Sequence, residues 1–306
     1  MITVLCGGVG AARMLDALRL VVVPGEITGI VNTGDDLVMH GLRICPDLDT
    51  IAYTLAGLNN DETGWGLQGE TWRVMAELEA LRGESWFKLG DRDLATHLYR
   101  TTRLAQGASL VEVTAELCER LGVDVRLLPA TNDPIATTFD TVDHGRLSFQ
   151  EYFVRHHHDV VVRAVSIEGA ASAHPAPGVV EAIESAERIV ISPSNPLISV
   201  APILAVPGVR DALAARRRDV VAVSPLIGGR ALKGPADRLL IELGHEPTPG
   251  GIAALYREVA AVLVIDTADA ELAAGVIEQG LECRVTGTLM SDPAQAAGLA
   301  QVVLDG

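Results

Sequence analysis

A glycine-rich segment near the start of the sequence, Gly7-Gly8-Val9-Gly10-Ala11-Ala12-Arg13, could hold a phosphate group. It follows the apolar residues 2–5 and opens a segment with helical periodicity. Glycines let the backbone approach a phosphate, and free N–H groups at a helix N-terminus complement its charge. No Gly-Lys-Ser/Thr follows, so this is not a Walker A loop, and Arg13 stands where a dinucleotide fingerprint has its third glycine. The segment predicts phosphate binding by Gly8, Val9, Gly10 and Arg13. The alternative is a tight turn that needs glycine only for its geometry, which would have the same sequence pattern.

Carboxylates follow the next expected strand, residues 27–31, in the run Asn32-Thr33-Gly34-Asp35-Asp36. Adjacent carboxylates beside a phosphate site suit Mg²⁺, which prefers oxygen ligands. Asp49, in the first turn of a later helix, could face the same crevice and add a ligand or accept a proton, whereas Asp47 could be only the N-cap. The alternatives are an Asx turn at Asp35 and a solvated carboxylate that complements the helix dipole at Asp49.

Two loops further along the chain also follow expected strands. The strand predicted at residues 188–192 ends in the loop Ser192-Pro193-Ser194-Asn195-Pro196. In the same way, the strand predicted at residues 220–224 ends in the loop at residues 224–230. Small polar residues at successive strand ends can bind a nucleotide base or phosphate, although ordinary turns have the same composition. Lys233 opens the next helix and could meet a phosphate. The candidates in these loops are Ser192, Ser194, Asn195, Gly229 and Lys233.

Strands alternate with helices along most of the chain. This pattern predicts an α/β fold with a Rossmann-like, mostly parallel sheet and helices on both faces. Residues 47–121 instead contain successive amphipathic helical segments, so we expect a mainly helical insertion there, with residues 1–46 and 122–306 forming the nucleotide-binding domain. Residues 125–128, 135–141, 147–153 and 160–166 are expected to form a short β-rich portion before the main sheet resumes.

The composition excludes several classes of protein. The chain has 306 residues and a formal net charge of -16, which argues against a nucleic-acid binder and against attachment to anionic lipid. The four cysteines form no CxxC pair, so no zinc ribbon is expected. No basic segment precedes the first apolar run and no apolar run is long enough to span a bilayer, so we expect a cytoplasmic protein without a membrane partner.

Six segments occur together in one order: GGVGAAR, NTGDD, MHGLRICPDLDT, FKLGDRDLATH, SPSNP and LMSDP. In this combination the sequence resembles the 2-phospho-L-lactate transferase family, most closely its actinobacterial-type branch, phosphoenolpyruvate transferase. The resemblance runs from Met1 to the last helix. It implies a step in making coenzyme F-420, in which enolpyruvyl- or lactyl-2-diphospho-5′-guanosine gives its phosphoenolpyruvyl or phospholactyl group to the ribityl hydroxyl of the deazaflavin Fo and GMP is released. Mg²⁺ dependence and a homodimer are also implied.

The same resemblance assigns roles to individual residues. An Asp of the CPDLDT segment and a basic residue of the FKLGD segment contact Fo in such enzymes, and these fall on Asp49 and Lys88. Relatives have Arg where this chain has Lys88, and lysine cannot make the bidentate contact of arginine. The donor diphosphate would lie on residues 8–13 with Mg²⁺ on Asp35 and Asp49, and Arg13 would stabilise charge on the transferred phosphorus. The guanine would lie against the loops at residues 192–195 and 228–233, and the ring of Fo against a wall that includes Trp65, Trp72, Trp86 and Leu89, which could equally be plain core.

Two rival functions come from other classes. Gluconeogenesis-factor proteins resemble this fold and bind UDP-sugars as non-enzymatic regulators, but their acidic run resembles DDGGSSG, whereas Leu37-Val38-Met39-His40 follows Asp36 here. An NAD-dependent oxidoreductase is disfavoured by the missing third glycine and by the lack of a clear ribose-binding acid after the second strand.

Overall fold

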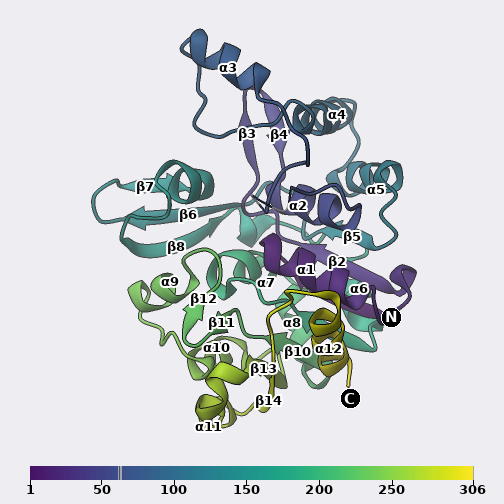
Figure 1. Cartoon of the computed structure of the whole chain (residues 1–306), viewed down its shortest axis with the longest axis vertical. Helices are drawn as coiled ribbons and strands as arrows, with labels where there is room; N and C mark the ends of the chain where they lie inside the picture. The colour runs from purple at the N-terminus through teal and green to yellow at the C-terminus, as the bar shows by residue number, and fades with distance from the viewer. Residues whose placement is uncertain (61, 63, 306) are drawn as a thin grey trace.

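A seven-stranded, all-parallel sheet forms the centre of the molecule in the computed structural model, which describes residues 1–60, 62 and 64–305 (Figure 1). The strands follow the order β14-β13-β10-β9-β1-β2-β5. Most of them come from short, nearly continuous apolar runs, as expected for strands that are covered on both faces, whereas the edge strand Glu282–Thr286 has no buried residue. They are β1 (Ile2–Cys6), β2 (Ile27–Val31), β5 (Arg126–Pro129), β9 (Arg188–Ile191), β10 (Val220–Val223), β13 (Val262–Asp266) and β14 (Glu282–Thr286).

Helices cover both faces of this sheet, which confirms the predicted fold class. Because side chains alternate along a strand, Val4 and Cys6 point into one core and Leu5 into the other. The first core is closed by α1 (Gly8–Leu18), α2 (Pro46–Leu55), α5 (Leu110–Leu121) and α12 (Pro293–Leu304). The second is closed by α6 (Val179–Ser185), α7 (Ala201–Ala205), α8 (Val209–Ala215), α10 (Pro249–Tyr256) and α11 (Ala273–Glu278).

The strand order creates a switch point between β1 and β9. After β1 the chain builds outward to β2 and β5, and then returns to place β9 on the other side of β1. The loops that follow β1 and β9 therefore adjoin at the carboxyl ends of the strands, where ligands of open α/β sheets bind, and we refer to this edge of the sheet as the crevice.

The helical segment predicted at residues 47–121 divides between two environments. Helices α2 and α5 pack on the main sheet. Helix α3 (Arg73–Ala80) instead packs with the hairpin of β3 (Leu37–Met39) and β4 (Leu42–Ile44), around Met39, Ile44, Met75 and Leu89. We call this hairpin, α3 and α4 (Asp93–Ala105) the upper lobe, and α3 projects furthest from the sheet in Figure 1. The division of the chain at residues 47 and 121 stays a prediction.

A second, antiparallel sheet of three strands lies beside the crevice. This small sheet consists of β6 (Ala136–Thr141), β7 (Arg146–Ser148) and β8 (Val162–Glu168) in the order β7-β6-β8. The prediction for residues 125–128 was wrong in one respect, because β5 pairs with β2 in the main sheet. The strand predicted at residues 147–153 is also shorter than expected, since a π-helical turn, Glu151–Arg155, follows β7.

One further α-helix and one hairpin lie below the small sheet in Figure 1. They are α9 (Ala236–Glu242) and the hairpin of β11 (Leu226–Ile227) and β12 (Arg230–Ala231). The other short helical segments are Pro24–Glu26, Ala170–Ser172, Pro196–Val200, Arg217–Asp219 and Thr267–Leu272. Among the described residues, no single helix is long and apolar enough to cross a membrane, and the one bent pair that passes on length and composition turns by 95° at its break.

Candidate functional site

The loops after β1 and β9 meet directly. Ser194 Oγ donates a hydrogen bond of 2.6 Å to the carbonyl oxygen of Gly7, and Ser192 Oγ donates one of 2.6 Å to that of Leu5. A Cβ atom on Gly10 would lie 2.6 Å from the carbonyl oxygen of Pro193, so this position requires glycine. The structure thus brings Ser192 and Ser194 to the predicted phosphate loop, where their hydroxyls support its backbone.

Helix α1 begins inside the crevice. Gly8 has a φ of +67°, a conformation that favours glycine, and its N–H donates to Oδ1 of Asp47 at 2.9 Å. An α-helix leaves its first N–H groups without a partner inside the helix, and Val9 and Gly10 present such groups here. Such groups, together with the positive end of the helix dipole, are suited to binding an anion.

Asp47 is a candidate site residue that the sequence analysis did not propose. It is not an N-cap, because Cys45 occupies that position and Pro46 opens α2. Its buried carboxylate accepts from Gly8 N–H and, at 3.0 Å, from Nδ2 of Asn32, so it joins the loops after β1 and β2. The signal was available, because proline is favoured at the first helical position and Pro46 therefore fixes where the helix starts.

Asp35 and Asp47 form a pair of buried carboxylates without a positive partner. Burial, followed by the charge of Asp47, raises the pKa of Asp35 well above its usual value, and burial raises the pKa of Asp47 to about 6. No Lys or Arg among the described residues pairs with either carboxylate, and Oδ1 of Asp35 is buried without a hydrogen-bond partner. Two such carboxylates beside an anion site fit a divalent cation with oxygen ligands.

The neighbouring Asp36 has partners of its own. Its Oδ2 lies 3.0 Å from a guanidinium nitrogen of Arg43 and 3.1 Å from Sγ of Cys45. Burial raises the pKa of Asp36 to about 6, although the charge of Arg43 opposes the shift. Of the two adjacent carboxylates predicted from the sequence, Asp35 is therefore the one left for a ligand.

Asp49 takes part in a different arrangement from the one predicted. Both of its carboxylate oxygens accept from the guanidinium of Arg100, a residue with only 1% exposure. Nδ1 of His97 lies 3.7 Å from Asp49, and Nε2 of His97 lies 3.2 Å from Asp93. Asp49, Asp93 and His97 offer ligand atoms within 4.8 Å of one another and could hold a metal ion, but Arg100 already balances the charge of Asp49.

Tyr53 completes this buried group, which we call the Arg100 network. Its hydroxyl donates to Oδ1 of Asp93 at 2.6 Å. Burial acts to raise the pKa of Asp93, but His97 and the Tyr53 hydrogen bond outweigh it and the pKa is lowered. The network joins α2 of the main core to α4 of the upper lobe, with every described member buried.

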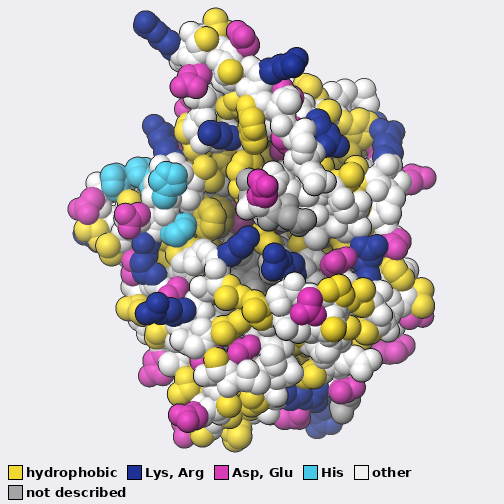
Figure 2. All heavy atoms as spheres, in the orientation of Figure 1, with side chains coloured by type: hydrophobic (Ala, Val, Ile, Leu, Met, Phe, Trp, Pro, Cys, Tyr) yellow, Lys and Arg dark blue, Asp and Glu magenta, His cyan; other side chains and the backbone are white. Residues whose placement is uncertain are grey.

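Three predicted cationic residues are exposed. Arg13 lies on α1, Lys88 precedes α4, and Lys233 lies between β12 and α9, and within the described part of the chain none of them enters an ion pair. A Cβ on Gly64 would lie 2.7 Å from Nζ of Lys233 and 3.9 Å from Cγ2 of Val9, which places Lys233 near the phosphate loop. Figure 2 shows Lys and Arg side chains at the middle of this face although the chain is strongly acidic.

The last two predicted binding residues, Gly229 and Asn195, differ in whether a polar group remains without a hydrogen-bond partner. The N–H of Gly229 donates to Oδ1 of Asp269 at 3.1 Å, so that backbone group is already used. Oδ1 of Asn195 accepts from Leu197 N–H at 2.9 Å, whereas its Nδ2 is buried without a partner in the described structure.

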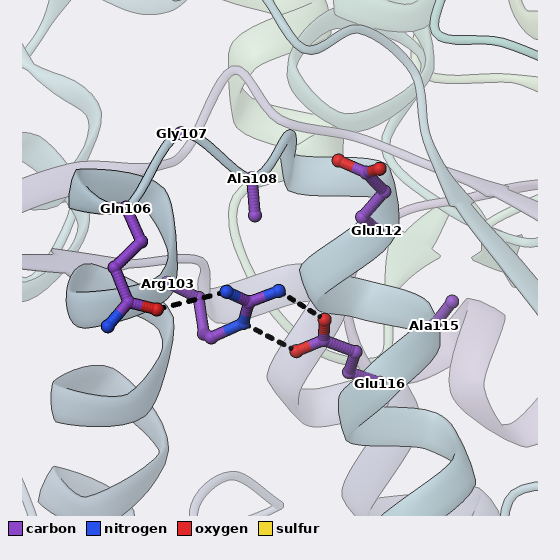
Figure 3. A pocket seen from close by; sticks show the side chains of 7 residues that line it. All are labelled: Arg103, Gln106, Gly107, Ala108, Glu112, Ala115 and Glu116. Carbon is purple, nitrogen blue, oxygen red and sulfur yellow. Dashed lines mark hydrogen bonds and ion pairs between the residues drawn. The ribbon is translucent and has the colours of Figure 1, made fainter.

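A cavity of about 450 Å³ lies elsewhere, between the end of α4 and the start of α5 (Figure 3). Arg103 crosses it to make a bidentate pair with Glu116, at 3.0 and 2.7 Å, and these hydrogen bonds lower the pKa of Glu116 to about 2. None of the predicted site residues lines this cavity. Its lining residues are Arg103, Gln106, Gly107, Ala108, Glu112, Ala115 and Glu116.

The raised pKa of Asp47 gives a testable pH dependence for the metal-free protein. Because the folded-state pKa of about 6 exceeds the unfolded value, this carboxyl favours folding below about pH 4, and that contribution is lost as the pH rises through 6. In Asp47→Asn, the free energy of unfolding should therefore fall less steeply between pH 4 and 7 than in the wild type. Urea denaturation in EDTA measures both slopes, and identical slopes would remove Asp47 from this account.

Comparisons with known proteins agree with the resemblance in the sequence. A family model described as 2-phospho-L-lactate transferase CofD matches residues 2–285. A phosphoenolpyruvate transferase of Kitasatospora aureofaciens is 45% identical over 99% of this chain and 96% of its own length. One from Mycolicibacterium smegmatis is 40% identical over 99% of this chain and 98% of its own. A crystal structure of a UPF0052 family protein from Bacillus halodurans has a TM-score of 0.62 over 99% of this chain and 98% of that one, and its 16% identity supports the fold alone.

Proposed function

This chain belongs to the 2-phospho-L-lactate transferase CofD family, and from that premise we propose that it is a transferase of coenzyme F-420 biosynthesis. It moves a phosphoenolpyruvyl group, or a 2-phospho-L-lactyl group, from the corresponding guanosine diphosphate ester to the ribityl hydroxyl of Fo. The relatives at 40–45% identity, named phosphoenolpyruvate transferases, favour the enolpyruvyl donor. The observation that carries the proposal is the pair of unneutralised carboxylates beside a helix N-terminus, in a chain that matches these relatives along 99% of its length.

Asp35 and Asp47 are the residues that we propose as ligands for Mg²⁺. Oδ1 of Asp35 has no partner among the described residues, and the two carboxylates together carry more negative charge than their surroundings balance. Asp49, which the sequence analysis proposed as a ligand, is paired with Arg100, so we assign that role to Asp47. When bound, the cation supplies charge stabilisation for the transferred phosphoryl group and for the leaving phosphate.

The phosphate loop binds and orients the donor. The N–H groups of Val9 and Gly10 hold the diphosphate, with Arg13 and Lys233 as the cations nearest to it. The oxygen of the ribityl hydroxyl forms the new P–O bond and its proton passes to water, while the P–O bond to GMP breaks and GMP leaves with the bridging oxygen and its electron pair. No covalent enzyme intermediate is needed, because the chain's role is to align the two substrates and stabilise charge.

The acceptor side lies in the upper lobe. Trp86 and Phe87 pack edge to face at 5.8 Å and border the apolar cluster of that lobe. Trp65 and Trp72 are 45% and 38% exposed and form a second edge-to-face pair at 6.2 Å. We propose that these rings bind the deazaflavin, that Lys88 contacts its polar groups, and that the protein works as a homodimer.

Substitution of the two lysines of this chain, Lys88 and Lys233, tests the acceptor site and the donor site separately. Lys88→Ala is expected to raise the KM for Fo by about tenfold, since a contact to a charged or polar group is worth roughly 1.5 kcal/mol, and to leave the KM for the donor nearly unchanged. Lys233→Ala is the matched control and should raise the KM for the donor instead. Steady-state rates with one substrate varied at a time measure both constants, and the reverse pattern would place Lys88 beside the diphosphate.

The direct test of the proposal is the product itself. The purified protein is incubated with Fo, Mg²⁺ and each guanosine diphosphate ester in turn, and the products are identified by mass spectrometry. We expect GMP together with Fo that carries the phosphoenolpyruvyl group. If neither ester gives transfer, and UDP-N-acetylglucosamine raises the melting temperature while Fo and guanine nucleotides do not, a regulator that binds nucleotide sugars would replace the transferase.

A further inference from the structure

The small sheet makes direct contact with the loop that carries Asp35. The N–H of Thr137 donates to the carbonyl oxygen of Gly34 at 2.8 Å. Nε2 of Gln150, which comes from the segment after β7, donates to the carbonyl oxygen of Asp35 at 2.9 Å. We propose that Gln150 is a positioning residue that fixes Asp35 for metal and diphosphate binding, an inference that rests on the proposed function.

The close approach of β6 to the loop at residues 32–36 depends on a glycine. A Cβ on Gly34 would lie only 2.6 Å from Oγ1 of Thr137, so glycine lets β6 pack against the loop. The loop also closes on itself, because Gly34 N–H donates to Oδ1 of Asn32 at 2.8 Å. Gln150 adds a bond from outside the loop, from a residue 115 positions further along the chain.

The Asp35 carboxylate needs such external support. One of its oxygens has no partner among the described residues, and the nearby Asp47 repels its ionised form. Asn32 also interacts with this carboxyl, but the unpaired oxygen leaves the backbone of residue 35 a part in setting its direction. Because Gln150 is 6% exposed, water has little access to replace its hydrogen bond, and loss of the amide would leave the Asp35 carbonyl unsatisfied and free to turn.

The residues next to Gln150 are packed in the core of the small sheet. Phe149 stacks on Phe153 with ring centroids 5.4 Å apart, and Tyr152 stacks on Phe139 at 4.1 Å. These rings form the core of the small sheet, so the residues on both sides of Gln150 are fixed by packing. A side chain that is locked by its neighbours can impose a position on the group it bonds.

The experiment uses the full chain and measures metal binding as well as rate. Gln150→Met removes the donor at similar size, and Gln150→Glu keeps the shape but replaces the donor with an acceptor. The control is Glu242→Gln, which removes the charge that pairs with Arg238 at 3.1 Å on the α9 side of the small sheet. Two readouts are taken for each: the Mg²⁺ concentration for the half-maximal thermal shift with guanosine diphosphate, and the Mg²⁺ concentration for the half-maximal rate.

Both Gln150 variants should need about tenfold more Mg²⁺ in each readout, since loss of a residue that orients a metal ligand typically costs 10- to 100-fold in metal affinity. At saturating Mg²⁺ the kcat should stay within about twofold of the wild type, and Glu242→Gln should lower the melting temperature without changing the Mg²⁺ requirement. Variants that lose stability but keep the wild-type Mg²⁺ requirement would overturn the proposal and leave the proposed function intact. A wild-type protein that shows no Mg²⁺-dependent binding of guanosine diphosphate would overturn both.

Discussion

Asp35→Asn is expected to lower the rate of group transfer by a factor on the order of 10³ while the protein stays folded. The charge stabilisation that a metal ion supplies in such reactions is worth several kcal/mol, and an amide in place of this carboxylate forfeits most of it. Burial and the charge of Asp47 disfavour the ionised carboxyl in the folded state. The neutral variant should therefore be at least as stable as the wild type at pH 8 without metal. Turnover with saturating substrates and urea denaturation in EDTA check the two statements.

Asp36 gives the matched control for this prediction. It is the adjacent residue and is also a buried carboxylate, but it is paired with Arg43 and Cys45. Asp36→Asn should therefore weaken stability more than turnover. An Asp35→Asn protein that keeps the wild-type rate and Mg²⁺ requirement would remove Asp35 from the metal site.

Asp49→Asn is expected to destabilise the protein by roughly 3–5 kcal/mol, the usual cost of removing one partner from a buried ion pair. The guanidinium of Arg100 is 1% exposed and would lose its only carboxylate partner at hydrogen-bond distance among the described residues. The second variant, Asp49→Asn with Arg100→Met, removes both charges and should recover more than half of the loss. The free energies of unfolding of the two variants, from urea denaturation, give the comparison.

This result separates two roles for Asp49. The sequence analysis expected a metal ligand or a proton acceptor, and that role predicts a loss of turnover at unchanged stability. The Arg100 network predicts a loss of stability that is relieved by the second substitution. A stable Asp49→Asn protein with turnover lowered by about 10² would favour the first role and contradict the second.

The sheet and its strand-end loops could be predicted from the sequence because their signals are local. Short apolar runs followed by Gly, Ser, Asn or Asp mark buried strands and their carboxyl ends, and the strand predicted at residues 188–192 is observed as Arg188–Ile191. In the same way, the polar residues that follow residues 27–31 predicted that Asp35 lies at the carboxyl end of a strand. The position of Pro46 would have shown that Asp47 is not the N-cap of α2, but its contacts to Gly8 and Asn32 join separate segments and could not be predicted in this way.

Contacts between distant segments could not be predicted from a local sequence pattern. Arg100 reaches Asp49 across 51 residues, and Gln150 reaches Asp35 across 115. Nothing in the periodicity of either segment specifies its partner, because the pairing depends on how helices and sheets pack. The same reason explains β5: its apolar residues indicate a strand, but only the path of the chain through α2, α4 and α5 brings it beside β2.

A crystal structure of the protein with guanosine diphosphate and Mg²⁺ tests the central claim most directly. The account predicts the diphosphate at the N–H groups of Val9 and Gly10, between the loops after β1 and β9, with the metal ion on Asp35 and Asp47. A nucleotide bound instead in the cavity between α4 and α5, or a metal ion held by Asp49, Asp93 and His97, would contradict it.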